Sequence, residues 1–222
     1  MPAPADHAPA LLLEASGPVV QVGLGGADGW LGYARSEAPA LESLTPLIAA
    51  VLKQAGLKLD DIGCFVYDEG PGTLLGLRLA AMTFRTWKAL PMHRTTPVFA
   101  FRSVEAAAAS LLAKGTKPPF GLVTEAGLGK WVLSEKRGEG SPGALEVVDA
   151  ERLAAYPHPL YHLAQRKQWK PLPCAATVFN LDLEALPVLL SVSQLSHSVD
   201  QPIPLRPVVQ DYVKWSGQRH RS

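Results

Sequence analysis

The segment IGCFVYDEGPGTLLGLRLA, residues 62–80, decides the fold class of this chain. Its first part, from Ile62 to Tyr67, is a continuous apolar run, as expected of a strand that is covered on both faces of a sheet. Residues 68–72 then predict a turn, and Thr73 is expected to cap a long helix that stops before Pro91. A buried strand that leads through a glycine turn into a helix is typical of an α/β protein.

The predicted helix after this turn has more apolar residues than one stripe can hold. Its first apolar face has helical spacing and comprises Leu77, Ala80, Ala81, Phe84 and Trp87. Its second apolar face comprises Leu75, Leu79 and Met82. Such a helix is either buried all round or packs on its own core with one face and on a partner with the other. Arg78 is either a partner anchor, since arginine is enriched at interface hot spots, or a solvated or salt-bridged residue.

The rest of the first half alternates strands and helices. Three short apolar runs separated by Gly-rich turns predict an antiparallel meander over 11–13, 19–24 and 30–34. A helix is predicted over Leu41–Ala55, and its apolar face includes Leu44 and Ile48. Gly56 is placed to cap its end, whereas its start is open, at Thr45 before Pro46 or earlier. A strand over 97–101 is expected to lead into a helix over 104–113 that Ser103 caps.

The second half begins after a linker predicted at residues 114–119. Strands are expected over 120–124, 130–134, 144–148 and 175–179. Helices are expected over 150–156, 160–169 and 184–195, and an extended tail over 202–215. This order of elements predicts α/β layers with a mixed sheet.

Composition narrows the class of protein. The chain has 222 residues, of which 47% are apolar and 18% charged, so we expect a globular protein. Its formal net charge of +1 provides no overall attraction to nucleic acid or to an anionic membrane. Cys64 and Cys174 lie far apart without metal-type spacing, which indicates a reduced, intracellular protein. Residues 1–10 lack a signal-peptide pattern and no stretch approaches the ~20 apolar residues of a membrane span, so we expect a soluble cytoplasmic protein.

Several motifs have a structural interpretation beside a functional one. The turn of Gly70, Pro71 and Gly72 could hold an anion at a helix N-terminus, but it matches neither a Walker A loop nor a dinucleotide fingerprint. A tight turn with close helix packing at Gly76 is the favoured interpretation. His158 and His162 have a spacing that can bind metal on a helix, but Pro159 between them and the lack of a supporting carboxylate argue against a metal site. The basic tail 214–221 is either an RNA contact or, as we favour, a solvated end.

Five stretches together resemble one protein family. They are LLLEAS, LTPLIAAVLKQAGLKLDDI, IGCFVYDEGPGTLLGLRLA, PVFAFRSVEAAAASLL and PIPLRPVVQDYVKW, and they resemble the TsaB (YeaZ) family in order and spacing. This family is the bacterial subunit needed for threonylcarbamoyladenosine formation on tRNA. The resemblance implies an α/β, actin-like (ASKHA, ribonuclease H-like) two-lobed fold with mixed sheets. We expect residues 1–104 to form the first lobe and 105–222 a more divergent second lobe.

The resemblance also implies a role for the chain. We expect a non-catalytic subunit without catalytic residues, metal or required cofactor, which binds a TsaD-type catalytic subunit and a TsaE-type ATPase, forms homodimers, and meets tRNA only indirectly. Pairing in the family uses the two helices of the first lobe. The expected contact residues are Leu44, Ile48, Leu75, Arg78, Leu79 and Met82.

The chain departs from the family pattern at two turns. The opening Asp-Thr-Ser is here Glu14-Ala15-Ser16, so Glu14 and Ser16 are expected to mark a vestigial nucleotide site. The usual Asp-Ala-Arg of the second lobe is here residues 125–127, which lack the arginine. An alternative function is an ATP-binding phosphotransferase or ATPase, in which Glu14, Asp68 or Glu69 would hold Mg²⁺. A third is a homodimer with a function separate from tRNA modification.

Overall fold

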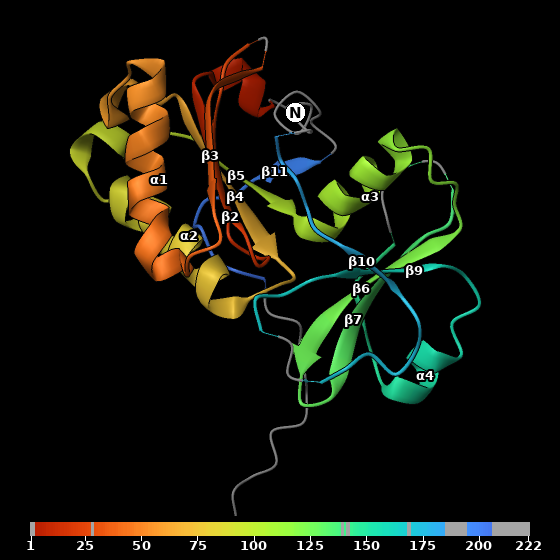
Figure 1. Cartoon of the computed structure of the whole chain (residues 1–222). Helices are drawn as coiled ribbons and strands as arrows, with labels where there is room; N and C mark the ends of the chain where they lie inside the picture. The colour runs from red at the N-terminus through yellow and green to blue at the C-terminus, as the bar shows by residue number, and fades with distance from the viewer. Residues whose placement is uncertain are drawn as a thin grey trace, which may run out of the picture.

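The computed structural model describes residues 3–27, 29–138, 140, 143–167, 170–184 and 195–205. These residues form two lobes, each built on a mixed sheet (Figure 1). The strand order is β11-β5-β4-β1-β2-β3 in the first lobe and β10-β9-β6-β7-β8 in the second. The predicted α/β architecture with two lobes and mixed sheets is therefore confirmed.

The first sheet begins with an antiparallel meander. Its strands are β1 (Ala10–Glu14), β2 (Val20–Gly25) and β3 (Trp30–Ser36), and β1 also pairs in parallel with β4 (Cys64–Gly70). β4 in turn pairs in parallel with β5 (Val98–Arg102). All residues of β1, β2 and β4 are buried, because helices cover both faces of the centre of this sheet.

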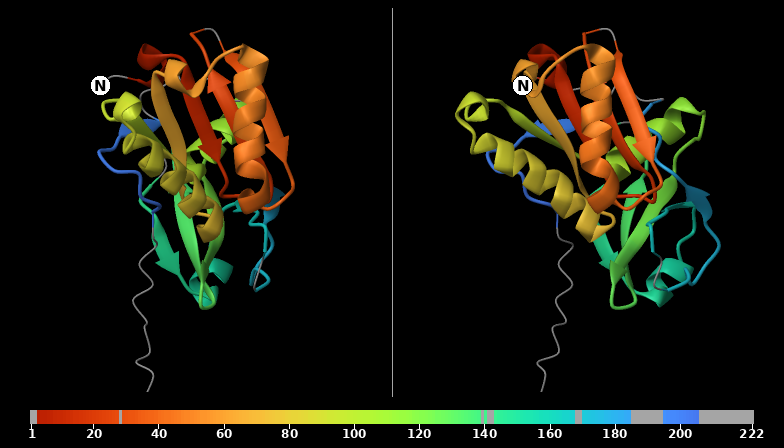
Figure 2. Two further views of the ribbon diagram at one scale, coloured as in Figure 1. Left: turned by 90° about the vertical axis from the view of Figure 1, so that its left-hand side faces the viewer. Right: turned by 60° about the vertical axis from the view of Figure 1, so that its left-hand side comes forward.

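Helices α1 (Ala40–Ala55) and α2 (Leu74–Lys88) lie side by side on one face of the first sheet (Figure 2). The core between them and the sheet is aliphatic and aromatic, with the Phe65 and Phe84 rings stacked at a centroid distance of 4.6 Å. Helix α3 (Ser103–Ala113) packs Ala106 on the opposite face, against β1, β4 and β5 side chains such as Leu12. Alternation along the strands thus divides the core into two layers.

The helix predictions need three refinements. α1 begins at Ala40, so Pro46 lies inside the helix, and Gly56 ends it with a left-handed φ of 67°. Thr73 stands at the N-cap of α2 but its side chain accepts no capping hydrogen bond. Ser103 is the first residue of α3, and its hydroxyl donates instead to the Pro71 carbonyl at 2.6 Å.

The second sheet contains β6 (Phe120–Gly127), β7 (Lys130–Lys136), β8 (Glu146–Val148), β9 (Leu160–Leu163) and β10 (Thr177–Phe179). A short helix α4 (Ala150–Ala154) follows β8. The helix predicted over 160–169 is wrong, because residues 160–163 form β9 between β6 and β10. Parallel pairing with both neighbours supplies the backbone partners that a helix would otherwise provide within itself.

The chain returns to the first lobe near its end. Strand β11 (Ser196–Ser198) pairs antiparallel with β5, and the Leu205 N–H donates to the Glu69 carbonyl at 2.7 Å. The Ile203 carbonyl accepts a hydrogen bond from the Tyr67 hydroxyl at 3.0 Å. The division that assigned all of 105–222 to the second lobe is therefore wrong for the segment 195–205.

Parts of two predicted elements lie outside the described residues: 185–194 of the helix expected over 184–195, and the tail from residue 206 on, which includes 214–221. Within the described residues, no helix combines the length and the apolar composition needed to cross a membrane.

Candidate functional site

The glycine turn, which connects β4 to α2, packs directly against the residues that follow β1. A Cβ added at Gly76 would lie 1.9 Å from the Ala15 carbonyl oxygen, and one at Gly72 would lie 2.5 Å from the Ser16 Cβ. The Thr73 N–H donates to the Ser16 carbonyl at 2.7 Å. The close packing predicted at Gly76 is therefore present, because the helix lies against the backbone of the β1–β2 turn.

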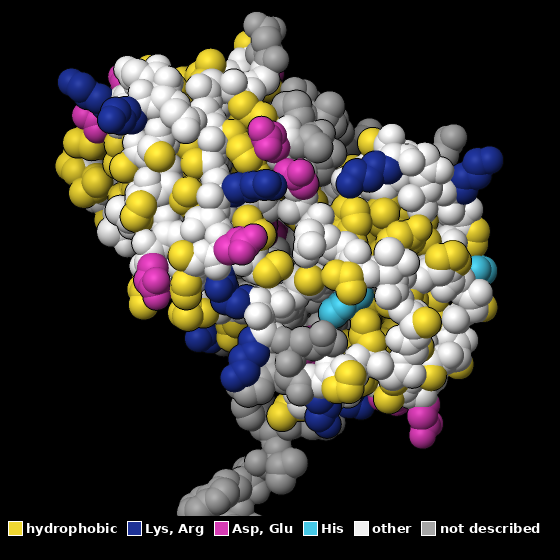
Figure 3. Space-filling model, in the orientation of Figure 1, with side chains coloured by type: hydrophobic (Ala, Val, Ile, Leu, Met, Phe, Trp, Pro, Cys, Tyr) yellow, Lys and Arg dark blue, Asp and Glu magenta, His cyan; other side chains and the backbone are white. Residues whose placement is uncertain are grey.

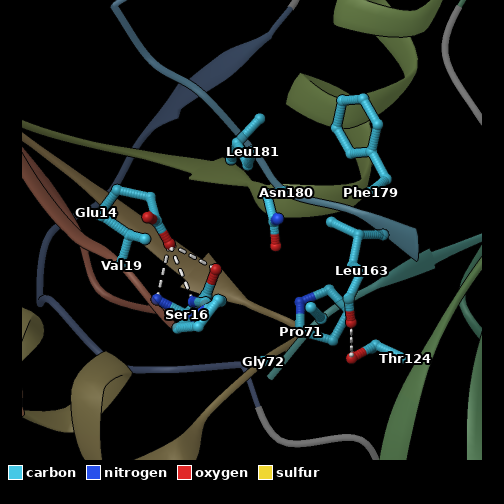
Figure 4. A pocket seen from close by; sticks show the side chains of 13 residues that line it. Glu14, Ser16, Val19, Pro71, Gly72, Thr124, Leu163, Phe179, Asn180 and Leu181 are labelled. Atoms are coloured by element: carbon cyan, nitrogen blue, oxygen red, sulfur yellow. Dashed lines mark hydrogen bonds between the residues drawn. The ribbon is translucent and has the colours of Figure 1, made fainter. Parts of the chain in front are cut away.

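Glu14, at the end of β1, is buried in this turn (Figure 4). Its Oε1 accepts hydrogen bonds from the Ser16 N–H at 2.6 Å, the Ser16 hydroxyl at 2.6 Å and the Gly17 N–H at 3.3 Å. Its Oε2 accepts one from Gln21 Nε2 at 2.9 Å. Burial raises the pKa of Glu14, and these hydrogen bonds act in the opposite direction. Glu14 and Ser16, paired in the sequence prediction, are thus in direct contact.

A second buried carboxyl, Asp68, lies near the first. Its Oδ1 accepts the N–H groups of Gly70 at 2.7 Å and of Ser103 at 3.1 Å. Its Oδ2 is buried and has no hydrogen-bond partner among the described residues. Burial, followed by the charge of Glu14, raises the pKa of Asp68 well above its usual range. The charged form of this carboxyl is therefore disfavoured.

The second lobe closes the cavity that Glu14 and Ser16 line. Its contributions to the opposite wall are Thr124, Leu163, Ala164, Phe179, Asn180 and Leu181. Figure 4 shows the Asn180 amide across the cavity from Ser16. The cavity volume is about 20 Å³, which is room for about one water molecule. This cavity is much smaller than a nucleotide.

Arg166, from the second lobe, forms hydrogen bonds to the first lobe at the edge of this cavity. The sequence analysis did not identify this role of Arg166. From the loop after β9, its Nη2 donates to the backbone carbonyls of Pro18 at 2.8 Å and Ala38 at 2.8 Å, and also to that of Glu37. Its backbone N–H donates to the Thr73 hydroxyl at 3.4 Å. One side chain thus contacts the β1–β2 turn and the entrance to α1.

The outward face of α2 is apolar and uncovered. Leu75 is 59% exposed and Met82 is 52% exposed, and Arg78 lies exposed between them. Leu79 is partly buried and packs against the core. None of the ion pairs among the described residues includes Arg78. Apolar side chains also gather at the left edge of Figure 3, over the end of α2 and the segment that follows, where Leu90 and Met92 are exposed.

The contact residues predicted on α1 are wrong. Leu44 and Ile48 are each only 5% exposed, because they belong to the core beneath the helix. The exposed leucine of α1 is Leu41, at 74%, in the first turn. Periodicity identified the apolar stripe correctly, but its assignment to a partner contact, which followed from the family resemblance, placed core residues on the outer side.

The two histidines do not form a helical metal pair. His162 is buried on β9, where burial lowers its pKa, and His158 lies in the preceding loop. In the part of the chain that the structure describes, no three His, Cys, Asp or Glu side chains are grouped closely enough to hold a metal ion.

Comparison with known families decides the assignment of the chain. A family model described as TsaD, tRNA N6-adenosine threonylcarbamoyltransferase, matches residues 38–158. The chain belongs to this family. The tRNA N6-adenosine threonylcarbamoyltransferase of Novosphingobium aromaticivorans is 39% identical over 69 residues. That match includes 31% of this chain but only 19% of the relative, so this TsaD-family chain matches about a fifth of the curated protein's length.

Solved structures show the same fold over most of the chain. YeaZ from Pseudomonas aeruginosa has a TM-score of 0.63 and 17% identity, with 88% of this chain and 98% of that chain aligned. A crystal structure of an uncharacterized protein with similarity to peptidase YEAZ, from the same species, has a TM-score of 0.63 and 18% identity, with 88% and 97% aligned. The predicted actin-like α/β fold class and the resemblance to the TsaB (YeaZ) family are confirmed.

Proposed function

We propose that this chain is a non-catalytic partner subunit of the machinery that forms threonylcarbamoyladenosine on tRNA. In this proposal it binds a TsaD-type enzyme through the outward face of α2. Membership of the TsaD family and the YeaZ fold support a role of the chain in this tRNA modification. The observation that carries the proposed role is the exposed stripe of Leu75, Arg78 and Met82 on a helix whose other face is already buried.

This stripe has the chemistry of a binding surface. Fully burying an exposed leucine or methionine contributes about 1.5–3 kcal/mol. Burial of Leu75 and Met82 against a partner would therefore favour association. Arg78, one turn from each, can add a charge-assisted contact at the centre. Leu41, in the first turn of the neighbouring helix α1, is another exposed apolar side chain.

The proposed mechanism is structural. The subunit stabilises the active arrangement of its enzyme and carries out no bond chemistry itself, and tRNA meets it only through that enzyme. A TsaE-type ATPase is the expected third component, and the expected location is the cytoplasm. A homodimer would use the same face of α2, so it would compete with the enzyme for Leu75 and Met82. We expect no cofactor in the cleft, and ATP binding there is the alternative.

A genetic rescue tests this function. The chain is expressed with its own TsaD-type enzyme in a strain that lacks TsaB, and the modified nucleoside is measured by mass spectrometry. We expect rescue by the wild type, and loss of most of the modified nucleoside with the double substitution Leu75→Glu and Met82→Glu. Leu128→Glu is the matched control, because Leu128 is 78% exposed at a turn of the other lobe. Folded wild-type protein that restores no modified nucleoside would contradict the proposal.

A further inference from the structure

Basic and acidic residues are unevenly distributed along this chain. The segment 70–102, from the end of β4 to the end of β5, contains five arginine and lysine residues and no aspartate or glutamate. With five of the 21 basic residues in this segment, 16 basic and 20 acidic residues remain in the rest of the chain. The formal net charge of +1 therefore conceals a cationic segment that includes the whole of α2.

The cations of this segment lie on the exposed side of α2 and just after it. Arg78, Arg85 and Arg94 are exposed, and none of the ion pairs among the described residues includes them. Arg78 lies three residues after Leu75 and four before Met82. Arg85 follows Met82 after three more residues, so the four side chains share one stripe of the helix. Exposed apolar and cationic side chains thus alternate along the outward face of α2.

Helix stability alone does not account for this pattern. Cations in the last turn of a helix interact favourably with its dipole, which explains Arg85 and Lys88. Lys88 also donates a hydrogen bond to the Thr96 carbonyl at 2.9 Å. The same effect favours acidic residues in the first turn, but α2 has none there, and Arg78 lies in the first half of the helix. The dipole therefore gives Arg78 no role.

The chemistry of this face defines the surface that would fit it. Leu75 and Met82 need an apolar cover, whereas an arginine that loses water beside them needs a carboxylate, because an unpaired buried charge is costly. An RNA backbone supplies anions but no apolar cover. Residues 206–222 of the chain itself include four basic residues and only one acidic residue, so they do not complement the face. The complement is an apolar protein surface ringed by carboxylates.

A second copy of the chain does not provide this complement. In a two-fold dimer the same patch meets itself, so the stripe of one α2 would lie against the stripe of the other. Each copy would bring exposed arginines and no carboxylate, since α2 contains neither Asp nor Glu. The neighbouring helix α1 adds one exposed acid, Glu42, and one exposed base, Lys53, which leave the balance unchanged. Repulsion between like charges therefore opposes pairing of this face with itself.

We propose that the α2 face binds an apolar surface ringed by carboxylates on a different protein, and that its arginines exclude a second copy of this chain. The inference rests on the proposed function in one respect, which is that the TsaD-type enzyme carries this surface. Arg78, Arg85 and Arg94 attract the acidic ring before contact, and Leu75 and Met82 provide the apolar burial after it.

The salt dependence of enzyme binding tests the acidic ring. The purified full-length chain is titrated calorimetrically with its TsaD-type enzyme at about 50 and about 500 mM sodium chloride, and the wild-type dissociation constant should rise at least ~10-fold with salt. The double substitution Arg78→Gln and Arg85→Gln should weaken binding at low salt and reduce the response to salt. Arg137→Gln is the control, because Arg137 is an exposed arginine of the second lobe, and it should behave like the wild type.

The two proposals fail in different ways in this titration. Binding that does not respond to salt, or that the arginine double variant retains in full, would overturn the inference and leave the proposed function intact. Absence of binding at both salt concentrations would contradict the proposed function, and sedimentation of the chain alone would then decide whether the arginines exclude a second copy.

Sedimentation velocity tests that exclusion without the enzyme. At about 50 mM sodium chloride the wild type should be monomeric, and the double substitution Arg78→Gln and Arg85→Gln should increase self-association, because it removes repulsion from an apolar face. A double variant as monomeric as the wild type would overturn the exclusion. So would a wild-type dimer at low salt that the double substitution Leu75→Glu and Met82→Glu abolishes.

A tRNA titration tests the remaining occupant of the face. The wild type and the variant with Arg78→Gln and Arg85→Gln are titrated with unmodified tRNA at the lower salt concentration, and equal affinities are expected. Loss of tRNA binding in the arginine variant, with its affinity for the enzyme unchanged, would overturn the inference, because the face would then be a nucleic-acid site.

Discussion

The interlobe cleft and the outward face of α2 differ in whether their side chains have partners within the chain. In the cleft, the polar donors of the β1–β2 turn are occupied by Glu14, and Arg166 closes the edge with bonds to backbone carbonyls. On α2, by contrast, Leu75 and Met82 stand exposed without a cover from the described residues. The polar groups of the β1–β2 turn are thus paired within the chain, whereas these apolar side chains of α2 are not covered by the described residues.

The two regions contribute differently to the free energy of the chain. A closed polar cleft contributes rigidity, because each of its bonds fixes one element to another. An open apolar stripe contributes binding free energy only when another surface covers it. The two regions are also in contact, because Gly76 on the inner face of α2 packs against Ala15 in the β1–β2 turn. The turn at the cleft therefore holds α2 in place.

Disrupting the contact between α2 and the β1–β2 turn should have the largest effect on stability. In Gly76→Ala the new Cβ would meet the Ala15 carbonyl oxygen at 1.9 Å, and both partners are backbone that cannot turn aside. We expect the free energy of unfolding to fall by about 3 kcal/mol, measured by denaturant titration. Gly138→Ala is the control, since a Cβ at Gly138 meets no atom within 4 Å. Equal stability of the two variants would show that α2 does not depend on this contact.

Opening the edge of the cleft should have a smaller effect. Arg166→Ala removes the bonds to the carbonyls of Pro18 and Ala38, and we expect stability to fall by about 1–2 kcal/mol. The amides of Gly17 and Val19 should also exchange hydrogen faster, which mass spectrometry measures. Arg137→Ala removes an exposed arginine whose ion pair is with nearby Glu135, so it should change neither quantity. Unchanged exchange in Arg166→Ala would remove the interlobe role of this residue.

Replacing the buried Asp68 carboxyl by a neutral amide should have the smallest effect at acidic pH, and the size of the effect depends on pH. The folded pKa of Asp68 is raised, so its contribution to stability is complete below the unfolded pKa of about 4 and is lost as pH rises through the folded value. Asp68→Asn should therefore change stability little at pH 4 and increase it at pH 8, where the wild-type carboxyl would otherwise carry a buried charge. Melting curves across this range measure the difference. A variant that is less stable than wild type at pH 8 would contradict it.

The local parts of the fold were predictable from the sequence. The run from Ile62 to Tyr67, the glycine turn and the helix that follows are strong local signals, and Gly56 ended α1 as expected. Residues 160–163 were wrongly predicted to be helical. They form a strand because they pair with β6 and β10, and such non-local pairing cannot be detected from the local sequence pattern. The return of β11 to the first sheet is non-local for the same reason.

The candidate site was predictable only in part. Glu14 and Ser16 were identified through a resemblance, but their direct contact depends on how the turn folds back. Arg166 gave no signal, because its partners are backbone carbonyls from 128 to 148 positions away in the sequence. The stripe of Leu44 and Ile48 showed the period of a helix, and period alone does not say which side faces the sheet.

Binding to the enzyme tests the central claim most directly. Isothermal titration of the purified chain against the TsaD-type enzyme of the same organism should give a complex for the wild type and for Leu128→Glu with equal affinity. The double substitution Leu75→Glu and Met82→Glu should weaken binding by at least ~100-fold, because it places two charges in the buried centre of the contact. Undiminished binding by the folded double variant, or no binding by the wild type, would contradict the account.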